Sequence, residues 1–400
     1  ECPFKHACLG GTDVKEQCEP GHEGKYCDVC EDGYVHSADG TCSACNDGSF
    51  IAVAIVIPIV VFLVFVVVIL ADKAEEYNFS SLRTKVKIMI TFIQILSQMP
   101  SVFGALFPEG YLSFLDIFGL FNLNIISFLS LGCVIESNFY SQLLTATVGP
   151  LILVILVAFA LLIKKRATRH SFNPYHMAEF RKDMLTAILM ITFFIFSPTS
   201  ITIFEAFTCE SFDDGTNQLV ADYSINCDTD VHKNYEIYAG FMIIVYPIGI
   251  PIFYFYLLVS NHKYVNPSAA LVVREDEKML SYTEIQHLSF LYENYAPKRW
   301  YFEVLDCFRR LLLTAIPVLI LRGTSLQLLL VLMASLVWCI VYMSLKPFER
   351  PNDNTIAIMS QWAISFTLIG GVMLKVTADE QNAQYYVIDV LLIFINVTVI

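Results

Sequence analysis

Long uncharged stretches recur along most of this chain, separated by short polar segments. Runs of about 20 apolar residues are long enough to cross a bilayer as helices, and they lack the period-2 alternation that marks a transmembrane barrel. The pattern therefore predicts an all-α polytopic membrane protein with about nine transmembrane helices. The predicted spans are 50–71, 88–107, 144–163, 184–204, 237–259, 300–321, 326–345, 355–374 and 386–400.

Residues 1–49 have a different composition from residues 50–400, which we take as the helical transmembrane domain. Seven of the 12 cysteines lie in this first segment, together with many glycines and acidic residues. It has too few large apolar side chains to form a core, so disulfides must hold it together. We therefore predict a small cysteine-rich extracellular domain. An odd cysteine count and a first residue other than Met indicate a piece of a longer protein.

The basic residues predict the orientation of the spans. If the cysteine-rich head lies outside, the inner segments hold seventeen Lys and Arg, whereas the outer loops after the head hold only Lys233, Arg322 and Lys375. Cytoplasmic loops carry such an excess of positive charge, and disulfides also require the oxidising side. We expect a multi-pass cell-membrane protein with its N-terminus extracellular or lumenal. Counting the apolar residues 117–135 as a span would invert this bias, so segment 111–140 is predicted to be an outer interfacial or re-entrant helix.

Acidic residues exceed basic ones, with 38 Asp and Glu against 25 Lys and Arg and a net charge of −13. This balance argues against nucleic acid as a partner, since phosphate binding needs a basic face. Much of the excess falls in the outer loop 205–236, where Cys209 and Cys227 are expected to form a disulfide. The loop is a candidate for attracting cations at a pore mouth or, more weakly, for binding Ca²⁺; a plain solvated loop is the alternative. Its candidate residues are Glu210, Asp213, Asp214, Asp222, Asp228 and Asp230.

Charged residues open the predicted span 300–321. Asp306 lies three and four residues before Arg309 and Arg310, so all three share one helical face, and Glu303 lies one turn earlier. Charges at that depth must pair or face the bundle interior. We expect an ion-pair cluster at the inner edge of the bilayer with snorkelling arginines; a gating or permeation element is the alternative.

The densest cluster of helix-breaking residues lies within span 237–259. Pro247, Gly249 and Pro251 free backbone carbonyl groups in the middle of the span. They predict a hinge or a cavity wall, with a plain kink as the alternative. Motifs of soluble enzymes are absent from the sequence, so we do not expect an enzyme, a catalytic residue or a resident metal.

The head resembles a laminin-type EGF-like module. The resemblance rests on the run from Cys18 to Cys30, with Gly21 and Gly24 inside it, followed by Gly33-Tyr34, Gly40, Cys42 and Cys45. It implies pairing of Cys18 with Cys27 and of Cys30 with Cys42, and leaves Cys2, Cys8 and Cys45 unassigned. Cys27, Cys30, Cys42 and Cys45 also have zinc-site spacing, although an outer location favours disulfides.

The second half of the chain resembles the TRP-like membrane proteins, a group that includes fungal flavin carriers and polycystin-related proteins. The residues that carry this resemblance are Leu288, Leu291, Tyr292, Tyr295, Arg299, Glu303, Arg309, Arg310, Gln327, Lys346, Pro347, Phe348 and Asn354. Under an EGF-like head, the combination is similar to uncharacterised protist and algal proteins.

The TRP-like resemblance implies cation transport or calcium homeostasis. We therefore expect a cation channel subunit or transporter with an extracellular anchoring or sensing module, in which a homo-oligomer is an open possibility. A non-conducting receptor or adhesion protein that binds an extracellular or matrix ligand is the first alternative, and a lipid transporter or scramblase is the second. The chain departs from the fungal relatives at its N-terminus, where they carry a lipid-binding β-domain.

Overall fold

The computed structural model describes 7–9, 17–31, 33–36, 42–44, 80–103, 107–118, 138–168, 174–265, 288–320, 323–377 and 383–400. The predicted span 50–71 lies outside the described residues. So do residues 119–137 of the predicted interfacial segment, as well as Cys2 and Cys45.

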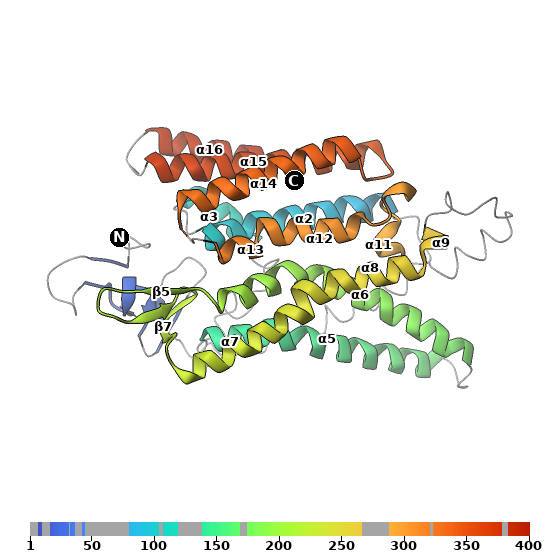
Figure 1. Cartoon of the computed structure of the whole chain (residues 1–400), viewed down its shortest axis with the longest axis horizontal. Helices are drawn as coiled ribbons and strands as arrows, with labels where there is room; N and C mark the ends of the chain where they lie inside the picture. Colours follow the sequence, from blue (N-terminus) through green and yellow to red (C-terminus); the bar gives the residue numbers. More distant parts are fainter. Residues whose placement is uncertain are drawn as a thin grey trace.

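Helices that run along the long axis make up most of the molecule, and a small β-rich part lies at one end (Figure 1). In chain order, the helices of the first part of the chain are α2 (Ser80–Phe103), α3 (Glu109–Asp116), α5 (Phe139–Thr168), α6 (Pro174–Glu205), α7 (Asp230–Ile243), α8 (Gly249–Ser260) and α9 (His262–Val265). They are followed by α11 (Ser289–Tyr292), α12 (Phe302–Leu313), α13 (Ala315–Val318), α14 (Ser325–Leu345), α15 (Pro351–Thr377) and α16 (Ala383–Val397).

Six helical segments among the described residues are long and apolar enough to cross a membrane, which supports a multi-pass helical membrane protein. They are Leu82–Phe103, Phe139–Ile163, Phe180–Glu205, Asp230–Ser260, Ser325–Leu345 and Pro351–Lys375. Each overlaps a predicted span. The predicted span 386–400 corresponds to the shorter apolar helix Tyr386–Val397.

The region of the predicted span 300–321 is not one continuous helix, because the chain breaks between α12 and α13. Thr314 has non-helical backbone angles (φ −126°, ψ −62°). Pro317 explains the break, since a proline ring clashes with the carbonyl group four residues earlier and offers no N–H to it. The side chain of Gln327 in α14 donates to the carbonyl oxygen of Pro317 at 2.7 Å and to that of Val102 at 3.2 Å, and so links α13 to α14 and α2.

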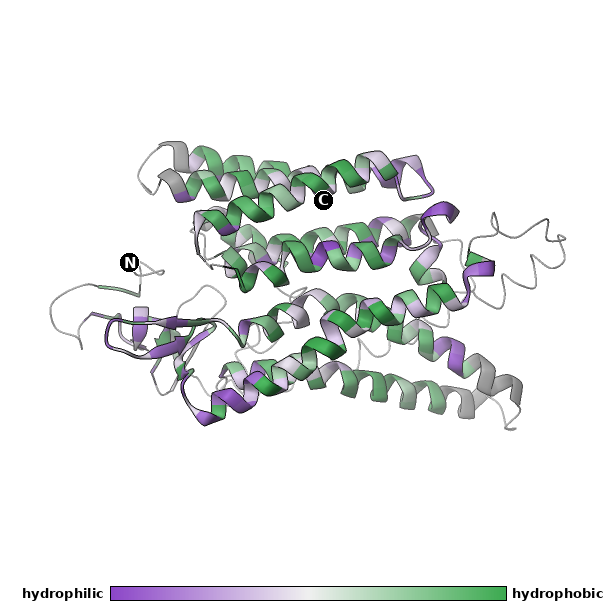
Figure 2. Cartoon of the chain, in the orientation of Figure 1, coloured by the Kyte–Doolittle hydropathy of each residue, from purple (hydrophilic) through white to green (hydrophobic). Residues whose placement is uncertain are grey.

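The packing distinguishes helices that face lipid from helices inside the bundle. Only 22% of the apolar window of α5 is buried, against 78% for α6, which packs on it. Ile155 and Phe159 of α5 are 66% and 62% exposed, as expected for side chains that contact lipid tails. In Figure 2 the long helices are mostly green and therefore apolar, whereas α12 also contains hydrophilic positions.

The head consists of two short hairpins held by disulfides. Strand β1 (His22–Glu23) pairs with β2 (Val29–Cys30), and β3 (Tyr34–His36) pairs with β4 (Cys42–Ala44). The structure contains the bonds Cys18–Cys27 and Cys30–Cys42, in agreement with the pairing that the EGF-like resemblance implies. These bonds exclude the zinc alternative for the three cysteines Cys27, Cys30 and Cys42. Cys8 is disulfide-bonded as well.

The outer loop between α6 and α7 folds into a three-stranded antiparallel sheet. Its strands are β5 (Cys209–Ser211), β6 (Asn217–Leu219) and β7 (Asp222–Asn226), in the order β5-β6-β7. The predicted disulfide between Cys209 and Cys227 is confirmed and closes the sheet at its base.

Candidate functional site

The head contacts the sheet of the outer loop through two neighbouring residues, Lys25 and Tyr26. The ammonium group of Lys25 donates to Asp214 Oδ2 at 2.5 Å and lies 4.7 Å from the ring centre of Phe212. The hydroxyl group of Tyr26 donates to Glu210 Oε1 at 3.2 Å, and the Tyr26 ring packs edge-on against Tyr223. An ion pair, a hydrogen bond and ring contacts therefore join segments that lie nearly 190 residues apart.

Three of the six acidic residues predicted to attract cations form specific contacts instead. Glu210 accepts from Tyr26 and also from Tyr223 at 2.9 Å. Asp222 accepts from the backbone N–H of Phe139 at 2.9 Å, where α5 begins. Its carboxylate thus satisfies one of the free N–H groups of that helix end.

The third of these residues, Asp214, pairs with Lys25 on the exposed rim of the contact. Hydrogen bonds from Lys25 and from Thr216 hold the pKa of its carboxyl group below the usual range. Burial and the neighbouring Glu210 raise the pKa of Tyr26, so its hydroxyl group stays protonated and donates. The other predicted acids, Asp213, Asp228 and Asp230, are exposed.

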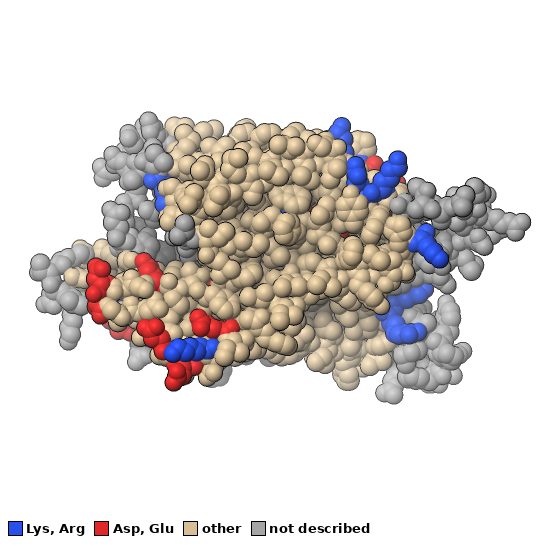
Figure 3. All heavy atoms as spheres, in the orientation of Figure 1, with Lys and Arg blue, Asp and Glu red and all other residues tan. Residues whose placement is uncertain are grey.

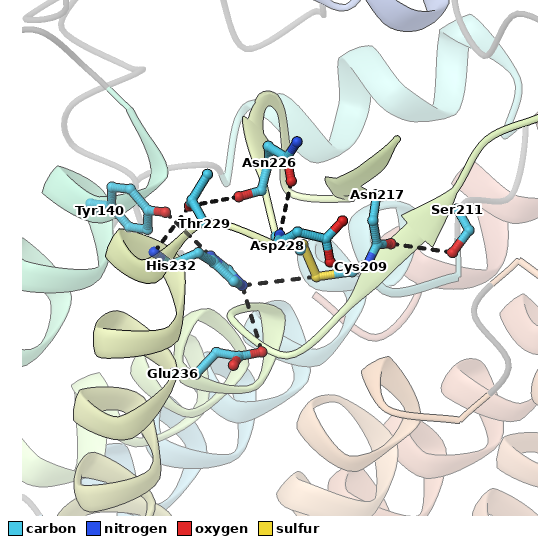
Figure 4. Close-up of a disulfide and its surroundings, with 10 residues drawn as sticks. Tyr140, Cys209, Ser211, Asn217, Asn226, Asp228, Thr229, His232 and Glu236 are labelled. Atoms are coloured by element: carbon cyan, nitrogen blue, oxygen red, sulfur yellow. Dashed lines mark hydrogen bonds and ion pairs between the residues drawn. A yellow bond between two sulfur atoms is a disulfide. The ribbon is translucent and has the colours of Figure 1, made fainter. Parts of the chain in front are cut away.

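A fully buried histidine lies beneath the loop disulfide (Figure 4). His232 Nε2 lies 3.8 Å from Cys209 Sγ and 3.6 Å from a carboxylate oxygen of Glu236, while Nδ1 lies 3.2 Å from the hydroxyl oxygen of Tyr140. Both cysteine sulfurs of this group are bonded to each other and are not available to a metal ion. The histidine instead ties the loop to the first turn of α7 and to α5.

Below this turn, α7 passes into the predicted hinge. Residues Ile244–Ile248 form a single π-helical turn that contains Pro247 and continues into α8. A Cβ atom on Gly249 would lie 2.8 Å from the carbonyl oxygen of Ile244, so the turn requires glycine here. Turns of this kind often occur at functional positions. Pro251 lies in the following turn of α8.

The predicted ion-pair residues lie inside the bundle, in the half farthest from the head. Glu303 and Arg310 are fully buried, and Asp306 and Arg309 are 6% exposed. The prediction of snorkelling arginines is therefore wrong. Asp306 binds Arg309 at 2.8 Å and Arg310 at 3.0 Å through its two oxygens, as the i,i+3 and i,i+4 spacing predicted.

Sequence reasoning missed the partners that other helices contribute to this cluster. Lys87 of α2 donates to Glu303 Oε2 at 2.5 Å and to the carbonyl oxygen of Phe290 at 3.0 Å. Tyr295 donates to Glu303 and Tyr342 donates to Asp306. The only signal in the sequence was the position of Lys87 at the edge of an apolar run, where it counted as an ordinary inner-loop residue.

The fold and its two polar sites define a multi-pass helical membrane protein with a disulfide-bonded head. No protein family, curated protein or solved structure matches the chain.

Proposed function

We propose that this chain is a surface membrane protein that acts as a sensor, in which the extracellular head sets the conformation of the helical bundle. The observation that carries the proposal is the contact of Lys25 and Tyr26 with the outer loop. That loop continues at one end into α6 and at the other into α7, which holds the π-helical turn. Binding of an extracellular ligand to the head would therefore act on α7 and the π-helical turn that follows it, through a short, disulfide-closed connection.

The distribution of charge supports the outer location of the head. Acidic side chains gather at the end of the molecule with β5 and β7, and most of the visible Lys and Arg lie at the opposite end (Figure 3). Basic residues favour the cytoplasmic side. The charge distribution therefore supports an extracellular or lumenal location for the head, which also suits its disulfides.

Hydrogen–deuterium exchange of the full chain in lipid nanodiscs tests the sensor function. Lys25→Glu replaces attraction to Asp214 with repulsion and should speed exchange both in the loop 209–227 and in α7. Adding Asp214→Lys restores an opposite-charge pair and should restore protection. Lys298→Glu is the matched control, because Lys298 is exposed and lies outside both the head contact and α7. Faster exchange limited to the head, with α7 unchanged, would exclude coupling to the bundle.

A cation channel subunit of the TRP-like type is the second candidate. The exposed acids Asp213, Asp228 and Asp230 favour it, because exposed carboxylates at the outer end can concentrate cations, although Asp230 also lies 3.7 Å from Lys233. In planar-bilayer recordings at low salt, replacing all three with asparagine should reduce cation conductance at least about two-fold. A purified wild-type chain that conducts no ions would rule out this candidate and leave the sensor.

A further inference from the structure

A cavity of about 30 Å³ adjoins the buried ion cluster. Its lining includes Lys87 and Thr91 of α2, Asp306 and Arg309 of α12, and Ser360 and Gln361 of α15. Phe348, in the turn between α14 and α15, also lines it. That turn lies at the end of the bundle opposite the head (Figure 1), so the cavity belongs to the basic end of the molecule.

The charged side chains of the cluster do not balance. Lys87, Arg309 and Arg310 contribute three positive charges, whereas Glu303 and Asp306 contribute two negative ones. The nearby buried carboxylate of Asp353 does not line the cavity, and its electrostatic partners are Arg350 and Lys85. One uncompensated positive charge inside a membrane protein is costly. Among the described residues, the cluster therefore lacks one negative charge.

The hydrogen bonds show the same imbalance. The carboxylate of Asp306 accepts from Arg309, Arg310 and Tyr342, so both of its oxygens are occupied. Lys87 uses two of its three donors, on Glu303 and Phe290. Arg309 uses two of its five, on Asp306 and Gln361. The cavity wall therefore offers cationic N–H donors rather than free carboxylate oxygens.

We propose that this cavity is a binding site for a small inorganic anion of the chloride type, held between Lys87 and Arg309. The volume accommodates about two water-sized spheres, enough for a monoatomic anion with one water molecule. The anion neutralises the excess positive charge of the cluster and accepts hydrogen bonds from the unused N–H donors. The site is independent of the head contact on which the proposed sensor function rests.

Thermal unfolding of the full chain in nanodiscs tests the site. Chloride replaces gluconate at constant ionic strength, because gluconate is too large for the cavity. The unfolding midpoint of the wild type should rise and saturate with chloride, by roughly 4 °C or more at concentrations far above the dissociation constant. A midpoint that is the same in chloride and gluconate would overturn the proposal.

Two variants separate the site from a general salt effect. Ser360→Leu fills the cavity without removing a charge and should abolish the chloride response; Thr355→Leu, on the exposed face of the same helix, should keep it. The line width of the chloride NMR signal provides a readout that does not depend on unfolding. It should broaden with the wild type and narrow with Arg309→Gln. A chloride response that persists in Ser360→Leu, or equal line widths, would refute the site.

Discussion

At the scale of single residues, the buried ion cluster shows that charged side chains inside the bundle need ionic and hydrogen-bonding partners. Glu303 is fully buried and receives Lys87, Tyr295 and Arg310 from three directions. Lys87 comes from α2, Tyr295 precedes α12 in the chain, and Arg310 lies about two turns further along α12. Charges that cannot reach water persist only with such compensation.

Removal of one charge from the cluster should therefore be severe. We expect Glu303→Gln to lower the free energy of unfolding by about 3–5 kcal/mol, because it leaves Lys87 buried without its carboxylate. Lys87→Met should cost a similar amount, and the double variant should cost clearly less than the sum of the two. The control Lys298→Ala changes an exposed residue and should stay within about 0.5 kcal/mol. Unfolding titrations in micelles measure all four, and additive effects would contradict the pairing.

The head contact should depend on pH through Asp214. Its pKa is lowered by Lys25 and Thr216, so the bound form of the head holds fewer protons than the free form. The contribution of this pair is fully present above the ordinary carboxyl pKa, near 4, and is lost as pH falls below it.

Fluorescence energy transfer between labels on the head and on the outer loop measures this dependence. The signal should fall on acidification in the wild type and change less in Asp214→Ala, which cannot titrate and creates no glycosylation acceptor. An identical pH profile for both proteins would show that Asp214 does not control the contact.

At the scale of the element, two glycines of one span have opposite roles. Gly249 lies directly after the π-helical turn, where an added Cβ atom would meet the carbonyl oxygen of Ile244 at 2.8 Å. Gly240 lies within α7, and an added Cβ atom there would have no atom within 4 Å. A Cβ atom added at Gly249 would therefore clash with the backbone, whereas one added at Gly240 would lie in open space.

Alanine at these two positions should change stability in opposite directions. We expect Gly249→Ala to destabilise the protein by about 1–3 kcal/mol, since the π-helical turn must shift. Gly240→Ala should stabilise it by up to about 1 kcal/mol, through helix propensity alone. Thermal unfolding of the matched pair provides the comparison, and a stabilising Gly249→Ala would show that the turn tolerates a side chain.

At the scale of the whole molecule, the separation of charge sets the expected orientation in the membrane. The sequence contains an Asn78-Phe79-Ser80 acceptor that belongs to the predicted inner side, and it should remain unmodified there. Asp214→Asn creates a new Asn-Gly-Thr acceptor with Gly215 and Thr216 on the outer loop. Expressed with microsomal membranes, this variant should gain one glycosidase-sensitive increase in mass that the wild type lacks. If instead the wild type were glycosylated and the variant were not, the predicted orientation in the membrane would be wrong.

The sequence by itself determined the features that depend on local pattern. Apolar runs of bilayer length located six of the long helices, and the helical spacing of Asp306, Arg309 and Arg310 predicted their mutual ion pairs. The break at Thr314 was missed, although Pro317 marks it. The run of apolar residues around that proline resembled a continuous span because hydropathy does not register a lost backbone hydrogen bond.

Only the tertiary structure decided which distant residues meet. Lys87 and Glu303 are 216 residues apart, and Lys25 and Asp214 are 189 apart. Hydropathy and helical period describe one segment at a time, whereas these contacts depend on how each helix is rotated and which helix lies beside it. Burial then turned what the sequence presented as an interfacial set of charges into an internal cluster. In the outer loop, Glu210 and Asp214 accept hydrogen bonds from the head, and Asp222 accepts one from the start of α5.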